Sequence, residues 1–203
     1  MTENFPWRCL LPALILLLPL FMPAAAASDE SGINSQLPHS SAIAAQNIVS
    51  QIRSGQPVSY NNITVTGQLD LSRMEGPISQ ALVITNSRFQ GPVLIEGVTF
   101  SQDLDLRGST FQDNVSFARS RFMGDAKFSG ARFMKLADFA DVYFDASSSF
   151  IAASFSGDCS FSSAEFRGDA AFLGASFAND VDFDDARFIR SGSFRAARFE
   201  DVR

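Results

Sequence analysis

The sequence predicts an all-β fold, a parallel β-solenoid, and three observations lead to it. Phe recurs at alternating steps of five and six residues, as in FLGASFANDVDFDDARF at 172–188. A small or modest apolar residue stands two positions before most of these Phe residues, and the residue between them is usually polar. Residues i and i−2 of an extended segment share a face, so each unit is a short strand with one large and one small inward group. Short strands that face one interior and are joined by tight corners wind into a solenoid.

The Phe positions continue through most of the chain. Starting at Ile84, the alternating steps give 22 positions up to Phe199, of which 19 are Phe and three are Ile84, Ile95 and Leu106. Four steps add up to 22 residues, which we take as one coil with four sides. Stacked coils place Phe over Phe at the inter-strand spacing of about 4.8 Å. The predicted core ladder consists of Phe111, Phe117, Phe122, Phe128, Phe133, Phe139, Phe144, Phe150, Phe155, Phe161, Phe166, Phe172, Phe177, Phe183, Phe188, Phe194 and Phe199.

The repeating unit resembles that of the pentapeptide-repeat family. That unit has a small residue, a polar residue, a central Leu or Phe, and two outward positions, and the match covers about residues 63–203, including LDLS at 69–72 and LDLR at 104–107. The resemblance implies a right-handed square β-helix with four units per turn. A coil of 22 residues instead of twenty departs from the family pattern, and we expect this to alter the corners and leave the solenoid intact.

The N-terminal segment has the order of a secretory signal peptide. Arg8 precedes a continuous apolar run, and small residues follow at Ala24 to Ala27. This order predicts a signal peptide over 1–27 with cleavage before Ser28. An uncleaved membrane anchor is the alternative, although three prolines interrupt the run. The chain is therefore expected to be exported to a periplasm, a thylakoid lumen or the extracellular space, with membrane contact only if the segment is retained.

Residues 28–41 are polar and rich in Ser, which is typical of a flexible linker. An amphipathic capping helix is expected over 42–55, because Ile43, Ile48, Val49 and Ile52 share one helical face and Gly55 ends it. Ser40 or Ser41 is the expected N-cap. Residues 56–203 form the predicted solenoid, whose open first coil the helix would cover.

The C-terminal sequence RAARFEDVR stops in the middle of a unit. One expectation is an uncapped last coil that pairs with a second copy to give a homodimer. The other is that the chain is cut short.

Few residues suggest catalysis, and no cofactor is expected. His39 falls in the linker, and Cys159 occupies an inward small-residue position, where a buried thiol is a poor nucleophile. Glycines two positions after a central residue are expected to have positive φ at corners. They are Gly97, Gly108, Gly124, Gly130, Gly157, Gly168 and Gly174.

The extra residue of the six-residue units is often acidic. Asp103 would stack on Asp125, and Asp158 on Asp180, one coil apart. Stacked carboxylates can bind calcium, so these four residues are candidate metal ligands. The simpler interpretation, which we favour, is that Asp and Asn side chains bind the local backbone in their own turns. No metal site is therefore expected.

The formal net charge of −6 gives no reason to expect nucleic-acid binding. The predicted function is a non-enzymatic exported scaffold or protein-interaction rod, with an unidentified protein partner. The first alternative, implied by the resemblance alone, is a DNA-mimic inhibitor of a type II topoisomerase. The second is a calcium- or glycan-binding β-helix.

Overall fold

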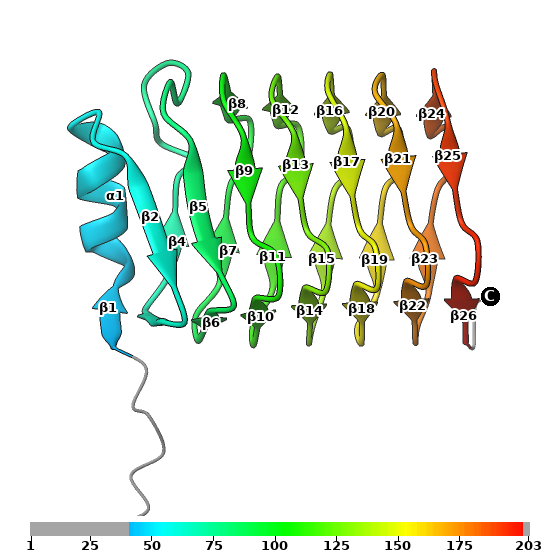
Figure 1. The fold of residues 1–203 in the computed structure, drawn as a ribbon, viewed down its shortest axis with the longest axis horizontal. Coiled ribbons are helices and arrows are strands. Elements are labelled where there is room, and N and C mark those ends of the chain that lie inside the picture. The colour runs from blue at the N-terminus through cyan, green and yellow to red at the C-terminus, as the bar shows by residue number, and fades with distance from the viewer. Residues whose placement is uncertain (1–40, 201–203) are drawn as a thin grey trace, which may run out of the picture. The chain divides into compact units, whose positions relative to one another are not determined.

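The computed structural model describes residues 41–200, which form a parallel β-solenoid with one helix at its N-terminal end (Figure 1). The predicted fold class is confirmed. The predicted signal peptide, nearly all of the predicted linker and His39 lie outside the described residues. Across residues 41–200, no helix has the length and apolar character needed to span a bilayer.

The N-terminal end is covered by β1 (Ala42–Ala44), α1 (Ala45–Arg53) and β2 (Val58–Asn61). The helix is shorter than expected because β1 pairs with the first coil and places Ile43 beside Val65. Ile43 therefore belongs to a strand, and the predicted N-cap at Ser40 or Ser41 is wrong: the N-cap is Ala44, whose side chain makes no capping bond. The buried face of α1 consists of Ala45, Ile48, Val49 and Ile52.

Four parallel sheets form the sides of the solenoid, numbered here in the order in which the chain visits them from β2 onward. Sheet 1 contains β2, β5 (Leu82–Thr85), β9 (Leu104–Asp105), β13 (Ala126–Lys127), β17 (Ser148–Ser149), β21 (Ala170–Ala171) and β25 (Gly192–Ser193). Sheet 2 contains β1, β3 (Thr64–Thr66), β6 (Arg88–Phe89), β10 (Thr110–Phe111), β14 (Arg132–Phe133), β18 (Ser154–Phe155), β22 (Ser176–Phe177) and β26 (Arg198–Phe199).

The remaining two sheets complete each coil. Sheet 3 contains β4 (Leu69–Asp70), β7 (Val93–Leu94), β11 (Val115–Ser116), β15 (Ala137–Asp138), β19 (Cys159–Ser160) and β23 (Val181–Asp182). Sheet 4 contains β8 (Thr99–Phe100), β12 (Arg121–Phe122), β16 (Tyr143–Phe144), β20 (Glu165–Phe166) and β24 (Arg187–Phe188). Five-residue corners lead from sheet 1 to 2 and from sheet 3 to 4, and six-residue corners lead from sheet 2 to 3 and from sheet 4 to 1.

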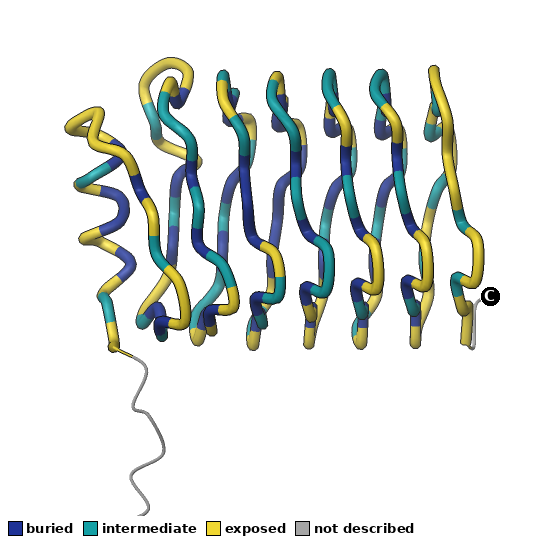
Figure 2. The backbone as a smooth tube through the Cα atoms, viewed as in Figure 1, coloured by how far each residue is buried: buried dark blue, intermediate teal, exposed yellow. Residues whose placement is uncertain are grey.

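The Phe ladder fills the interior, as the sequence predicted. Phe111 pairs with Phe133, one coil of 22 residues later, and their rings stack with centroids 4.9 Å apart. Rings from opposite sides meet edge to face in the interior, as between Phe139 of sheet 3 and Phe150 of sheet 1, at 5.4 Å and 90°. Figure 2 shows the buried positions recurring at the same places in successive coils. Burial of each Phe side chain stabilises the fold by about 1.5–3 kcal/mol before entropic costs. The stacked Phe rings are therefore the main part of the hydrophobic core.

The first coil is two residues longer than the others. Leu82 pairs with Val58, a separation of 24 residues, whereas Ile78 pairs with Phe100, a separation of 22. The two additional residues therefore lie before Ile78, at the corner between sheets 3 and 4. They enlarge the loop of residues 72–77, which we call the first-coil loop, between β4 and β5 in Figure 1.

At the other end, burial falls off in the last described coil. Phe183, Phe188 and Phe194 are half-buried, and Phe199 is 48% exposed although its ring still stacks on Phe177. Within residues 41–200, no element covers the outer edges of β23, β24, β25 and β26. The predicted core ladder thus continues to Phe199, with its last members open to solvent.

Candidate functional site

The five-residue corners use the left-handed backbone conformation that was predicted for the corner glycines. The position two residues after the central Phe, Leu or Ile of a unit has a positive φ at these corners. The φ is 65° at Gly97 and 67° at Gly108, and the non-glycine residues Arg119 and Ala152 have φ of 58° and 54° at the same position. A turn hydrogen bond closes the corner, for example from the Ala131 N–H to the Phe128 carbonyl oxygen at 2.9 Å. The conformation is thus imposed by the corner and accepted by several residue types.

The glycines at six-residue corners have another role, so the prediction of positive φ is wrong for Gly124, Gly157 and Gly168. A Cβ at Gly168 would lie 2.2 Å from the carbonyl oxygen of Ala146 in the preceding coil. A Cβ at Gly124 would meet the peptide group between Gln102 and Asp103 at 2.6–2.7 Å. Glycine is needed here because two coils approach backbone to backbone.

The first pair of candidate metal ligands, Asp103 and Asp125, lies beside the ammonium group of Lys127. One Asp103 carboxylate oxygen accepts the backbone N–H of Asp125 at 3.0 Å, and the other lies 2.7 Å from Lys127 Nζ. The carboxylate of Asp125 lies 3.7 Å from the same ammonium group. The hydrogen bond from Lys127 is the main reason that the pKa of Asp103 is lowered. Asp103 and Asp125 therefore bind backbone N–H groups as expected, but those of the next coil, at Asp125 and Ser147, and not those of their own turns.

The second candidate pair, Asp158 and Asp180, is exposed at the corner between sheets 2 and 3. Both residues line a shallow hollow of about 440 Å³ that also contacts Cys159. The Cys159 thiol is buried, and this burial raises its pKa well above the usual value. Among residues 41–200, no three His, Cys, Asp or Glu side chains come close enough to hold a metal ion.

Other carboxylates serve as turn caps, a role that the sequence analysis missed. Asp138 accepts the backbone N–H of Ala140 at 2.9 Å, and Asp182 accepts that of Asp184 at 2.7 Å. Ser160 makes the same contact with Ser162 at 3.2 Å. All three precede a five-residue corner. A short polar residue directly before the central Phe of such units is the signal that could have revealed them.

Half of the basic side chains in residues 41–200, seven of fourteen, bind carboxylates, frequently of a neighbouring coil. Arg121 and Arg167 both bind Asp145, at 2.6 and 3.0 Å, and Lys135 binds Asp113 at 2.8 Å. Because these pairs are exposed, each contributes little stability. Seven arginines have no ion pair with any described residue. They are Arg53, Arg73, Arg88, Arg132, Arg187, Arg195 and Arg198.

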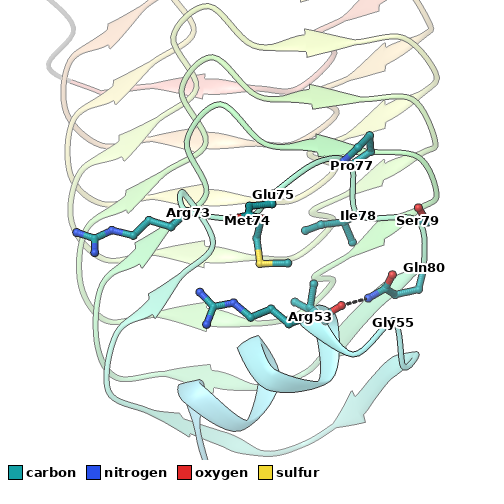
Figure 3. A pocket seen from close by; sticks show the side chains of 10 residues that line it. Arg53, Gly55, Arg73, Met74, Glu75, Pro77, Ile78, Ser79 and Gln80 are labelled. Atoms are coloured by element: carbon teal, nitrogen blue, oxygen red, sulfur yellow. Dashed lines mark hydrogen bonds between the residues drawn. The ribbon is translucent and has the colours of Figure 1, made fainter.

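Arg53 and Arg73 belong to the N-terminal cleft, a hollow of about 590 Å³ between the end of α1 and the first-coil loop (Figure 3). Gln80 holds the two parts together, because its side-chain amide donates to the Ile52 carbonyl at 2.8 Å. The Met74 side chain points into the cleft, and both arginine side chains extend toward the same side in this view. The cleft brings the apolar side chains of Met74 and Ile78 together with Arg53 and Arg73, which have no ion pair among residues 41–200. The seven-residue step from Leu71 to Ile78 is the sequence signal of this cleft.

Comparison with known proteins agrees with this architecture. Residues 84–132 match the family model of the pentapeptide repeats (9 copies). No curated protein and no solved structure matches the chain. The matched residues run from Ile84 into β14 and share their 22-residue coil with the coils that follow. The predicted resemblance is therefore confirmed, and the described chain has the pentapeptide-repeat β-solenoid fold.

Proposed function

We propose that this protein is a non-enzymatic, exported interaction rod that binds a protein partner at its N-terminal cleft. The observation that supports this most strongly is the break in the repeat. The coils from Ile84 onward keep a strict 22-residue spacing, and the longer first coil builds one wall of a hollow of about 590 Å³. An insertion that the stack itself does not need is a reasonable place for function.

The chemistry of the cleft favours an acidic partner segment with an apolar side chain. Arg53 and Arg73 are exposed and have no carboxylate partner among the described residues, while Met74 and Pro77 offer apolar contact. Arginine is suited to carboxylates because its planar guanidinium group donates two parallel hydrogen bonds. Glu75 on the same loop would disfavour partner segments that place a negative charge near the loop tip.

The test uses two variants of the full chain that alter the cleft in different ways. The first deletes Glu75 and Gly76 and restores a 22-residue first coil. The second is Arg53→Gln with Arg73→Gln. A matched control, Arg187→Gln with Arg195→Gln, removes two other arginines that have no ion pair among the described residues. Each chain is cross-linked in producing cells, fractionated, and analysed by intact mass.

We expect a cross-linked complex in the exported fraction, containing a chain that starts near Ser28. Both cleft variants should lose most of this complex while the control retains it. A chain without a partner in every fraction, or a complex that survives both cleft variants, would contradict the proposal. Full-length chain in the membrane fraction would change the rod from soluble to anchored. Inhibition of DNA supercoiling by the purified rod would support the DNA-mimic alternative, and calcium-dependent melting would support the calcium-binding one.

A second copy of the chain is another candidate partner, through the last described coil. Phe199 is 48% exposed there, and the edges of β23 to β26 are uncovered within the described residues. Open strand edges and exposed apolar rings are typical of strand-to-strand association. A dimer in solution that dissociates on Phe199→Glu, measured by light scattering, would support it. A monomer at all concentrations would contradict it.

A further inference from the structure

The outer face of sheet 2 carries a second hollow, of about 340 Å³, which we call the sheet 2 hollow. Arg88 and Arg132 both line it, on β6 and β14, with Thr110 on the strand between them. Asn62, Asn86 and Gly108 border it from the corner that leads into sheet 2, with φ of 55°, 51° and 67°. The hollow exists partly because Gly108 has no side chain: a Cβ there would lie 2.3 Å from the Asn86 side-chain oxygen.

The outward positions of sheet 2 carry no carboxylate in the coils from β6 to β26. These positions are Arg88, Thr110, Arg132, Ser154, Ser176 and Arg198. Elsewhere on the rod, six of the eleven described arginines and lysines pair with an acid one coil away, as Arg119 does with Glu96 at 2.9 Å. Arg88 and Arg132 have no such partner among residues 41–200. Two unpaired cations therefore border one polar hollow.

The spacing suits a single small anion. Neighbouring strands lie about 4.8 Å apart, so the backbones of Arg88 and Arg132, two strands apart, are separated by about 10 Å. Two long side chains can converge across that distance on one oxyanion above Thr110. The backbone N–H groups of this surface are already used: those of Thr110 and Arg132 donate to Ser87 and Ser109 carbonyl oxygens at 2.8 Å. Any anion must therefore be held by side chains.

We propose that the sheet 2 hollow binds one oxyanion, a phosphate, sulfate or carboxylate group, between the guanidinium groups of Arg88 and Arg132, with the Thr110 hydroxyl as a third donor. The planar guanidinium group matches such oxygens with paired hydrogen bonds. The anion would also relieve the repulsion between two nearby cations. The inference is independent of the N-terminal cleft, because the two hollows share no lining residue. In Figure 1 the end of α1 and the first-coil loop lie at the upper edge, whereas β6, β10 and β14 lie at the lower edge.

The test measures binding of inorganic phosphate to the full chain by NMR titration at constant ionic strength, because salt screens exposed charges. Arg88→Gln and Arg132→Gln remove the two main donors, and Thr110→Val removes the third while preserving shape. Arg198→Gln is the matched control: this arginine is also an outward residue of sheet 2, does not line the hollow, and has no ion pair with any residue of 41–200. Circular dichroism confirms that each variant is folded.

We expect saturable phosphate binding in the original chain and in Arg198→Gln. Binding should be at least tenfold weaker in either hollow arginine variant and severalfold weaker in Thr110→Val. Parallel titrations with acetate and O-phosphoserine separate a free anion from a group carried on a larger molecule: phosphoserine binding as tightly as phosphate indicates a carried group. Absence of saturable binding by all three probes, or an equal loss in Arg198→Gln, would overturn the proposal.

Discussion

The five-residue and six-residue corners both turn the chain from one sheet to the next, but different contacts hold them. A five-residue corner closes on itself, with a positive φ and a turn hydrogen bond such as that from Ala131 to Phe128. A six-residue corner is held by contacts with the preceding coil. At Gly168 the contact is a close approach to the backbone of Ala146, and at Asp125 it is a hydrogen bond from the backbone N–H to the Asp103 carboxylate. The comparison teaches that the extra residue changes a local turn into a contact between coils.

The largest difference between the two kinds of corner is expected in the free energy of unfolding that is lost when a corner glycine is replaced by alanine. Gly168→Ala places a Cβ against the Ala146 carbonyl oxygen and should lower the free energy of unfolding by about 3 kcal/mol, the upper range for overpacking. Gly174→Ala, at a five-residue corner with φ of 65° and open space around it, should cost only about 1 kcal/mol. Urea unfolding of both variants provides the measurement. Equal losses would show that the corners do not differ in this way.

A serine in the small inward position should contribute to the free energy of unfolding only where that position follows a five-residue corner. Ser120 donates to the Ile95 carbonyl at 2.6 Å and accepts the Val98 N–H at 3.0 Å, so it satisfies two buried groups of the preceding coil. Ser120→Ala should lower the free energy of unfolding by about 1–3 kcal/mol, because both groups lose their partner. The same urea assay measures it, and a neutral result would contradict the assigned role.

Ser148 is the matched residue after a six-residue corner. Its hydroxyl is buried and has no hydrogen-bond partner within the described part of the chain. Ser148→Ala should therefore leave stability unchanged or raise it by about 1 kcal/mol, because an unsatisfied hydroxyl is removed from the core. Thermal melting beside Ser120→Ala gives the comparison. A loss as large as that of Ser120→Ala would mean that Ser148 has a partner after all.

The smallest effect is expected from acid. Hydrogen bonds from Lys127, Lys135 and Ser191 lower the pKa of Asp103, Asp113 and Asp169, all at six-residue corners. A lowered folded-state pKa contributes stability above the unfolded value of about 3.9, and this stability is lost as pH falls through the folded values. The melting temperature should thus drop below about pH 4. The triple Asn variant of these residues should show a flatter profile, and an unchanged profile would contradict the assignment.

Much of the fold could be predicted because the same pattern of large and small inward residues recurs in every coil. The ladder from Phe111 to Phe199, the 22-residue coil and the helix near the N-terminus all follow from spacing and amphipathicity. The candidate sites could not be predicted to the same degree. Asp103 was placed in a corner correctly, but its partner Lys127 lies 24 residues further along the chain. The start of α1 was missed because the pairing of β1 with β3 overrides the helical pattern of Ile43.

The sequence by itself determined which residues face inward and how many residues make a coil, since an alternation of large and small groups can be read within a few positions. Only the tertiary structure decided which glycines need φ above zero and which need space, and which acids find a lysine or a backbone N–H. It also decided where unpaired arginines gather, as Arg88 and Arg132 do. The physical reason is that these contacts join residues one or two coils apart, and their geometry exists only once the coils are stacked.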